Sequence, residues 1–287
     1  MLRAVTLGFA LVLACATARA EVIVRSTHAI VIDEATGEVL LHKDESTAAP
    51  IASLTKLLTA MVVIDALQDA DEELRITEAD RDLLKRTRGG VPIGAVASRG
   101  ALIELAVIAS DNRAAAALAR CYPGGMVGFG AAMRRKIAAL GLADTLIEDP
   151  TGLSPDNRSS AQDMIKVLRA AAAYEAITRA TSLRTHTVIV NGRPWIVRNT
   201  NALVGSHGWT ILLSKTGFTN EAGHCLAMRV QTGGRTVVVV LMGAARRSVS
   251  RRDALNIRRW IAAGSASLMA KPGATTHLRP ASAGGTS

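Results

Sequence analysis

Three short motifs contain the residue types of a serine acyl-transfer site: Ser53-Leu54-Thr55-Lys56, Ser110-Asp111-Asn112 and Lys215-Thr216-Gly217. Residues three apart on a helix share a face, so Lys56 can reach the hydroxyl of Ser53. A lysine can take the proton of that hydroxyl only if its pKa falls far enough for the amine to be neutral. Burial among leucines, the helix start and the charge of Lys215 all lower the pKa of Lys56. The first motif therefore predicts Ser53 as the nucleophile and Lys56 as its base.

The other two motifs supply groups that an acyl transfer needs around the nucleophile. Ser110 can relay a proton to the leaving amine, and Asn112 can donate to a substrate carbonyl or contact Lys56; both residues can also cap a helix. The charge of Lys215, expected at a strand end, suits a carboxylate. We expect Asn112, Lys215, Thr216, Gly217 and Phe218 to bind the substrate, and the backbone N–H groups of Ser53 and Phe218 to form the oxyanion hole.

The elements that must position these motifs can be predicted from periodicity and turn signals. Apolar residues recur at helical spacing from Ser53 onward, after Pro50 and with the serine as a candidate cap. Further helices are expected over 101–109, 112–121, 126–140, 161–174 and 251–262, the last capped by Ser248 or Ser250. Alternating or apolar runs predict strands over 29–32, 39–41, 187–190, 195–197, 210–215, 224–231 and 235–242, with turns at Gly37, Asn191-Gly192 and Gly233-Gly234.

This order of elements indicates an α+β fold. Two early strands, a mostly helical middle and three late strands suggest one antiparallel sheet built from both ends of the chain. The hairpin around Asn191-Gly192 is expected to lie apart from that sheet, with Pro194 at an edge position.

Composition separates three segments: a signal peptide over 1–20, a catalytic domain over 21–264 and a flexible tail over 265–287 rich in Gly, Ala, Ser, Thr and Pro. The leader has a basic start, an apolar run and Ala18-Arg19-Ala20 before the cleavage point. It is too short for a transmembrane anchor, and Leu13 disfavours a lipoprotein cleavage before Cys15. Export to the periplasm is the resulting expectation.

Charge and cysteine content exclude some functions and leave one question open. The formal net charge is +10, but aromatic residues make up only 3% of the chain and no Lys/Arg stripe stands out, which argues against nucleic acid as a partner. The six histidines are scattered singly, so we expect no metal site. Cys121 and Cys225 remain after processing and could be free thiols or a disulfide.

Together the three motifs, in this order, resemble the low-molecular-mass penicillin-binding proteins of the D-alanyl-D-alanine carboxypeptidase family. The resemblance runs from about His28 to Gly264. It includes these further stretches: Ile51-Ala52-Ser53-Leu54-Thr55-Lys56-Leu57, Asn112-Arg113-Ala114-Ala115-Ala116, Tyr122-Pro123-Gly124-Gly125, Asp149-Pro150-Thr151-Gly152-Leu153-Ser154, Arg198-Asn199-Thr200-Asn201 and 215–226. The Tyr-Pro-Gly-Gly and Gly-His-Cys-Leu stretches are similar to the penicillin-binding protein 7 type of D-alanyl-D-alanine endopeptidase.

The resemblance implies a serine β-lactamase/DD-peptidase-like fold and a periplasmic hydrolase of peptidoglycan stem peptides. It implies an acyl-enzyme on Ser53 with Lys56 as proton acceptor, Ser110 and Lys215 at the site, no cofactor, and covalent inhibition by β-lactam antibiotics. D-alanyl-diaminopimelyl crosslinks are the expected substrate, with terminal D-Ala–D-Ala as the alternative.

Two other functions are less favoured by the sequence. A class A β-lactamase needs a carboxylate that activates water against the acyl-enzyme, and Glu148 is the candidate, but its spacing does not match. An inactive wall-binding module has no need of both Ser53 and Lys56.

Overall fold

Strands from the two ends of the chain lie side by side in one antiparallel sheet. The computed structural model describes residues 22–87 and 90–269. The sheet has five strands in the order β2-β1-β11-β10-β9. Its members are β1 (His28–Asp33), β2 (Val39–Lys43), β9 (Thr210–Thr219), β10 (Gly223–Thr232) and β11 (Arg235–Ala244). The predicted α+β class and the sheet built from both ends are confirmed.

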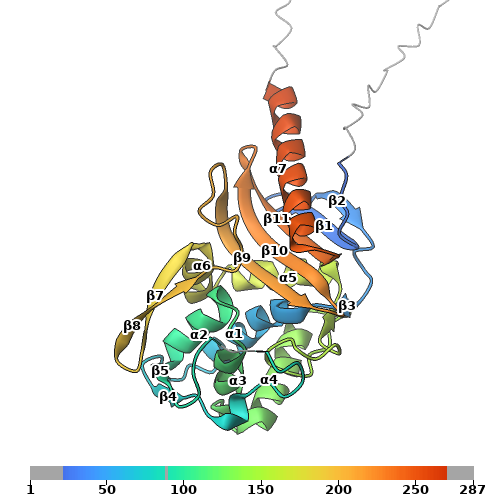
Figure 1. Cartoon of the computed structure of the whole chain (residues 1–287). Helices are drawn as coiled ribbons and strands as arrows, with labels where there is room; N and C mark the ends of the chain where they lie inside the picture. The colour runs from blue at the N-terminus through green and yellow to red at the C-terminus, as the bar shows by residue number, and fades with distance from the viewer. Residues whose placement is uncertain (1–21, 88–89, 270–287) are drawn as a thin grey trace, which may run out of the picture.

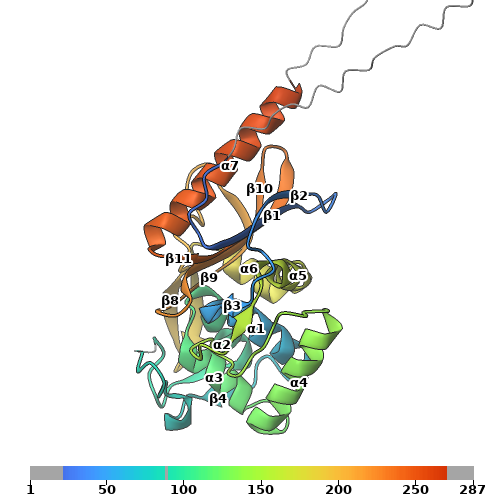
Figure 2. The same ribbon diagram turned by 90° about the vertical axis from the view of Figure 1, so that its right-hand side faces the viewer.

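The helical part of the chain comes between these strands and lies below the sheet in Figure 1. Its helices are α1 (Thr55–Asp65), α2 (Arg99–Ile108), α3 (Asn112–Arg120), α4 (Gly125–Ala139), α5 (Ala161–Ala171) and α6 (Glu175–Ser182), with short 3₁₀ turns η1 (Ala52–Leu54) and η2 (Glu78–Asp80). α6 was not predicted from the sequence. A last helix, α7 (Arg247–Met269), lies on the other face of the sheet (Figure 2).

The neighbouring strands β1 and β11 contribute side chains to two separate apolar cores, one on each face of the sheet. Ile30 and Ile32 of β1 pack with the helical part, whereas Ala29 and Val31 pack toward α7. β11 alternates in the same way. Successive strand residues point to opposite faces, so a sheet covered on both sides needs apolar residues at every position. This explains why β1 and β11 appear as uninterrupted apolar runs in the sequence.

Three small two-stranded sheets complete the fold. They are β3–β6 (Ala49–Pro50 with Arg158–Ser159), β4–β5 (Glu73–Arg75 with Val96–Ser98) and β7–β8 (Thr185–Val190 with Arg193–Arg198). The β7–β8 hairpin turns at Asn191 and Gly192, both with positive φ, and lies outside the main sheet as predicted. The first two pairs were not predicted, because two- and three-residue strands carry no measurable periodicity.

α7 differs from the sequence expectation at both ends. It begins at Arg247, so Ser248 and Ser250 lie inside the helix and do not cap it. It ends at Met269, so residues 265–269 are helical and not part of the tail that we expected to start at 265. Alanine and serine are tolerated in helices, and one glycine at 264 costs too little to stop a helix that is already packed. The rest of the expected tail and the predicted signal peptide lie outside the described residues.

The start of α7 is tied to the beginning of the described chain. The buried Asp253 carboxylate accepts hydrogen bonds from the backbone N–H of Arg25 at 3.0 Å and from the N–H and Oγ of Ser26, each at 2.7 Å. A buried carboxylate needs such donors to offset its lost hydration. Asp253 therefore fixes the helix to β1 and holds its first turns at the edge of the functional site.

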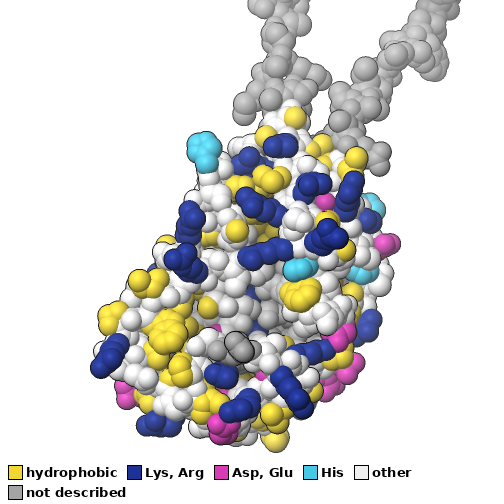
Figure 3. All heavy atoms as spheres, viewed as in Figure 1, with side chains coloured by type: hydrophobic (Ala, Val, Ile, Leu, Met, Phe, Trp, Pro, Cys, Tyr) yellow, Lys and Arg dark blue, Asp and Glu magenta, His cyan; other side chains and the backbone are white. Residues whose placement is uncertain are grey.

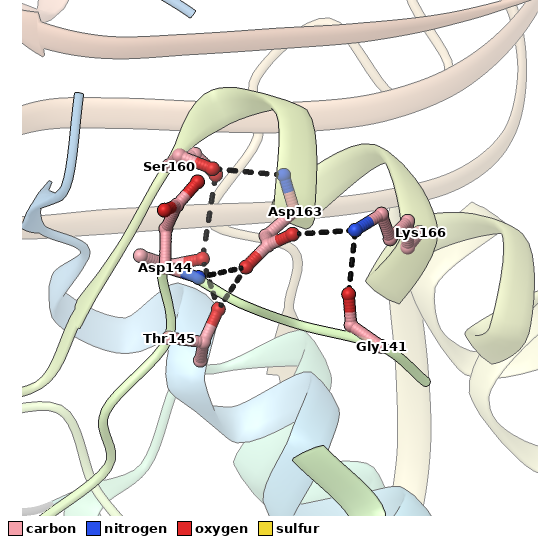
Figure 4. Close-up of polar contacts among 7 residues, drawn as sticks. Gly141, Asp144, Thr145, Ser160, Asp163 and Lys166 are labelled. Carbon is pink, nitrogen blue, oxygen red and sulfur yellow. Dashed lines mark hydrogen bonds and ion pairs between the residues drawn. The ribbon is translucent and has the colours of Figure 1, made fainter. Parts of the chain in front are cut away.

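The connection between α4 and α5 is anchored by a second buried carboxylate (Figure 4). Asp163 accepts from the N–H of Asp144 at 2.8 Å, from Thr145 Oγ1 at 3.0 Å and from Lys166 Nζ at 2.8 Å. Lys166 also donates to the carbonyl of Gly141, and Ser160 Oγ caps α5 by accepting from the N–H of Asp163. This network fixes both ends of the segment 141–160, and the middle of that segment reaches the candidate active site.

Both cysteines within the described residues are free thiols. Cys121 follows α3 and Cys225 is buried in β10, so the question left open by the sequence is answered in favour of unpaired residues. Across 22–87 and 90–269, no helix combines the length and hydropathy of a membrane crossing.

Candidate active site

Ser53 and Lys56 meet where η1 passes into α1. Lys56 Nζ lies 2.8 Å from Ser53 Oγ, as the three-residue spacing predicts. Ser53 does not cap the helix: its N-cap is Leu54, without a side-chain hydrogen bond. The residue before the serine, Ala52, has a left-handed φ of 48°, a strained conformation for a residue with a side chain. The serine hydroxyl is therefore not used as a helix cap and contacts the lysine instead.

Lys56 is completely buried and has three oxygen partners. Besides Ser53 it contacts Asn112 Oδ1 at 2.7 Å and the carbonyl oxygen of Thr151 at 2.6 Å. Burial lowers the pKa of Lys56 to about 7, although the charges of nearby aspartates, Asp149 first, oppose the shift. Desolvation penalises the ammonium form, as the sequence argument expected. A neutral amine can accept the serine proton across the same 2.8 Å contact.

The Thr151 carbonyl reaches Lys56 because of a loop shaped by Asp149. Its carboxylate accepts from the N–H groups of Thr151 at 2.6 Å, Gly152 at 3.0 Å and Ser154 at 2.8 Å. Gly152 has φ +83°, and a Cβ there would come within 2.0 Å of the Ala52 carbonyl oxygen. Only glycine allows this loop to lie directly against the turn that carries the serine.

Across the site, Ser110 and Lys215 form a second serine–lysine pair. Lys215 Nζ donates to Ser110 Oγ at 2.7 Å and to the Thr216 carbonyl at 2.8 Å. Burial, followed by the charge of Lys56, lowers the pKa of Lys215 well below its ordinary value. Ser110 lies between α2 and α3 with a left-handed φ of 59°, and Asp111, not Ser110 or Asn112, caps α3.

Lys215 lies in the middle of β9, not at a strand end as expected, because the strand continues to Thr219. Gly217 makes this continuation possible: a Cβ there would come within 3.0 Å of the Ser53 backbone nitrogen and of the Ile51 carbonyl oxygen. Thr216 Oγ1 donates to Thr200 Oγ1 at 2.6 Å. The Lys-Thr-Gly motif thus runs alongside the serine turn as an edge strand.

These residues surround a cavity of about 970 Å³, visible as a hollow near the middle of the face in Figure 3. Ser53, Ser110, Asn112, Thr216, Gly217 and Phe218 line it. Lys56 and Lys215 lie beneath its floor and contact the two serines. Phe218 is 54% exposed and stacks on His224 with ring centroids 4.3 Å apart. All eight predicted site residues are brought together.

Sequence reasoning missed several residues that hold the site residues in place, among them Thr87, which also lines the cavity. Asn112 Nδ2 donates to Thr87 Oγ1 at 2.9 Å, and Thr87 Oγ1 in turn donates to Asp82 Oδ2 at 2.7 Å. Asn157 accepts from the N–H of Asp149 at 3.0 Å. The stretch 149–154 was recognised as part of the resemblance, but no motif pointed to 82–87.

Glu148, the candidate carboxylate of a β-lactamase, is exposed and does not line the cavity. The backbone N–H of Glu148 donates to Asn157 Oδ1 at 2.8 Å. Asp149 is nearer, but the N–H groups of its own loop already bind both of its oxygens. Neither carboxylate is placed to activate a water at Ser53.

Replacing Lys215 by glutamine tests the second serine–lysine pair. We expect Lys215→Gln to slow acylation by penicillins roughly 100-fold, since removing a proton-relay or electrostatic group costs about that much. The melting temperature should not fall, because a buried ammonium with a lowered pKa destabilises the fold. Labelling kinetics and calorimetry measure both. Lys43→Gln, on β2 at the opposite edge of the sheet, is the matched control; a large fall in stability for Lys215→Gln alone would make this lysine structural.

The fold and the site define a class before any comparison. A serine that contacts a buried lysine, opposite a second serine–lysine pair beside a Lys-Thr-Gly strand, is the arrangement of serine hydrolases that react with penicillin. The sequence profile of the D-alanyl-D-alanine carboxypeptidase family matches residues 15–246. The chain therefore belongs to this family of serine-type DD-peptidases, as the resemblance implied.

Individual relatives agree with this assignment. The chain is 40% identical to a D-alanyl-D-alanine endopeptidase of Pseudomonas aeruginosa over 83% of its own length and 78% of the relative. It is 38% identical to a D-alanyl-D-alanine endopeptidase of Escherichia coli over 88% and 82%. The crystal structure of the Streptomyces K15 DD-transpeptidase superimposes with a TM-score of 0.77, covering 84% of this chain and 98% of that one at 23% identity. The last comparison supports the fold.

Proposed function

We propose that this protein is a D-alanyl-D-alanine endopeptidase that hydrolyses D-alanyl-diaminopimelyl crosslinks of peptidoglycan through an acyl-enzyme on Ser53. The observation that carries the proposal is the contact of 2.8 Å between Ser53 Oγ and a buried lysine whose pKa is about 7. A hydroxyl beside an amine that is partly neutral at physiological pH is an activated nucleophile. The family and the two endopeptidase relatives supply the substrate class.

In the acylation step, neutral Lys56 takes the proton of Ser53 Oγ, which attacks the carbonyl of the D-alanine before the scissile bond. Backbone N–H groups of Ser53 and Phe218 stabilise the oxyanion; the approach of Gly217 to the Ser53 nitrogen supports this placement. Ser110, held by Lys215, passes a proton to the departing amine, and the proton that Lys56 took is returned to Ser110, so Lys56 is neutral again. Asn112, Thr216 and Phe218 line the space for the substrate.

Water then attacks the ester carbonyl and releases the serine. Lys56, neutral again at this stage, takes a proton from the attacking water and returns it to Ser53 Oγ as the serine leaves. The chemistry requires no metal or organic cofactor. Penicillins present the carbonyl of a strained cyclic amide to Ser53 and are expected to acylate it.

We place this reaction in the periplasm, on the basis of the predicted signal peptide and of the substrate. A D-alanyl-D-alanine carboxypeptidase is the second candidate, because the same residues can cut a terminal D-Ala–D-Ala. Both substrates carry a carboxylate next to the scissile nitrogen, so the catalytic residues alone do not decide between them.

Direct comparison of substrates tests the preference. We expect purified protein to hydrolyse crosslinked stem-peptide dimers at least as fast as it releases D-alanine from monomeric pentapeptide, since the cavity continues beyond Phe218 to α7. Chromatography of both digests gives the rates, and Ser53→Ala protein is the blank. Rapid D-alanine release with dimers left intact would identify a carboxypeptidase instead.

A further inference from the structure

One wall of the cavity is formed by arginines. Among the described residues that line it are Arg198, Arg247, Arg251 and Arg252, and this part of the chain contributes no aspartate or glutamate to the lining. In Figure 3, Lys and Arg side chains gather on the same face above the hollow. A cleft lined by charges of one sign concentrates ligands of the opposite sign. The wall is therefore suited to anionic groups.

Arg251 and Arg252 have no acidic partner among the described residues, unlike several other arginines of the structure. Arg99, Arg120, Arg179, Arg229 and Arg235 each form an ion pair with a carboxylate. Within 22–87 and 90–269, the side chains of Arg251 and Arg252 form no hydrogen bond or ion pair, and both are exposed. Arg247, by contrast, donates to the Thr200 carbonyl. Burial, followed by the charge of Arg247, lowers the pKa of His224.

The positions of these arginines along α7 show which of them lie near the Lys-Thr-Gly strand and which lie further away. Six of the described residues of α7 line the cavity. Five of them follow the spacing of one helix face, namely Arg247, Ser248, Arg251, Arg252 and Leu255, and the sixth, Ser250, is buried. Four residues advance about 6 Å along a helix. Arg251 and Arg252 therefore lie about one turn further than Arg247 from Thr200 and the Lys-Thr-Gly strand.

We propose that Arg251 and Arg252 form a subsite for carboxylates of the leaving peptide that lie beyond the scissile bond. The proposal rests on the endopeptidase function above and names what part of the crosslink is recognised. In both candidate substrates the carboxylate next to the scissile nitrogen is present. A departing D-alanine carries no other, whereas the departing stem peptide of a crosslink adds the carboxylates of its glutamate and of its C-terminus.

The subsite thus separates the two substrates by charge. Arginine forms planar, paired hydrogen bonds with carboxylates and stays charged at every relevant pH. Exposed charge pairs of this kind each contribute modestly, so two of them amount to about a tenfold difference in affinity. Their contribution is screened by salt.

Kinetics of a double variant test this inference. In Arg251→Gln/Arg252→Gln protein, we expect the ratio of kcat/KM for crosslinked dimer to kcat/KM for pentapeptide to fall about tenfold, mainly through the KM for the dimer. The wild-type ratio should fall in the same direction as salt rises from low to high concentration. A dimer whose extra carboxylates are amidated should be cut equally well by both proteins.

Arg259→Gln is the matched control, because Arg259 is an exposed arginine of the same helix outside the cavity lining. It should leave the ratio unchanged. Penicillin labelling and the melting temperature verify that the double variant is folded. If the wild type cuts dimers and the double variant keeps the wild-type ratio, the subsite is refuted and the endopeptidase stands; if the wild type leaves dimers uncut, the proposed function itself fails.

Discussion

Ser53→Ala protein will carry no covalent label after incubation with a fluorescent penicillin, while the wild type is labelled stoichiometrically. The hydroxyl is the proposed acyl acceptor, and the second cavity serine, Ser110, contacts a lysine that is already bonded to a backbone carbonyl. The loss should be complete within detection, because no other nucleophile replaces the missing oxygen. Labelling on gels and intact-protein mass spectrometry measure it.

Ser110→Ala provides the comparison, since it also removes a serine hydroxyl from the cavity. We expect it to slow labelling without abolishing the covalent adduct. The turn around Ser53 is formed by backbone contacts that the substitution leaves in place, so Ser53→Ala should melt near the wild-type temperature. A labelled adduct that survives in the Ser53→Ala protein would assign the acyl group to another residue and contradict the proposed mechanism.

Lys56→Met will retain the fold and lose about 1000-fold or more of the acylation rate, in the range that a missing general base costs. In the wild type, the rate should rise with pH through about 7, because the amine accepts a proton only above its pKa. The variant's residual rate should lack this dependence. Stopped-flow acylation from pH 5 to 9 compares the two proteins.

Stability supplies the structural control for the same variant. A lysine whose folded-state pKa is lowered binds fewer protons folded than unfolded, so wild-type stability should rise with pH from about 7 toward the ordinary lysine range. Below that window the buried ammonium costs stability, and Lys56→Met should melt higher than the wild type at pH 6. A rate profile that is flat through pH 7 in the wild type would show that another group is the base.

The sequence predicts those parts of the site that are formed by side chains, and it does not predict contacts made by the backbone. Ser53, Lys56, Ser110 and Lys215 could be found because their chemistry demands those residue types at short, ordered spacings. The third partner of Lys56 could not, because it is the backbone carbonyl of Thr151, which any residue could supply. The position of this carbonyl follows from the Asp149 loop and from Gly152. A side chain at Gly152 would collide with Ala52, which lies 100 residues earlier in the chain.

The fold shows the same division. Hairpins with glycine or Asn-Gly turns were predicted at the correct places, since their φ values restrict the residue types. The end of β9 and the start of α7 were not, because tertiary contacts extend them. β9 continues through its glycine by lying against the Ser53 turn, and α7 begins early where its first residues border the cavity. α6, with eight residues, is too short for its periodicity to stand out.

Lys56 and Lys215 are both completely enclosed, and the carboxylates nearby are engaged elsewhere. In the free enzyme this pair works against folding. Selection for thermal stability alone would therefore favour apolar replacements at both positions. A homologue that is no longer needed for its activity would be expected to become more stable and inactive. Retention of both lysines therefore indicates selection for activity. A laboratory screen for heat resistance needs an activity assay in each round to keep them.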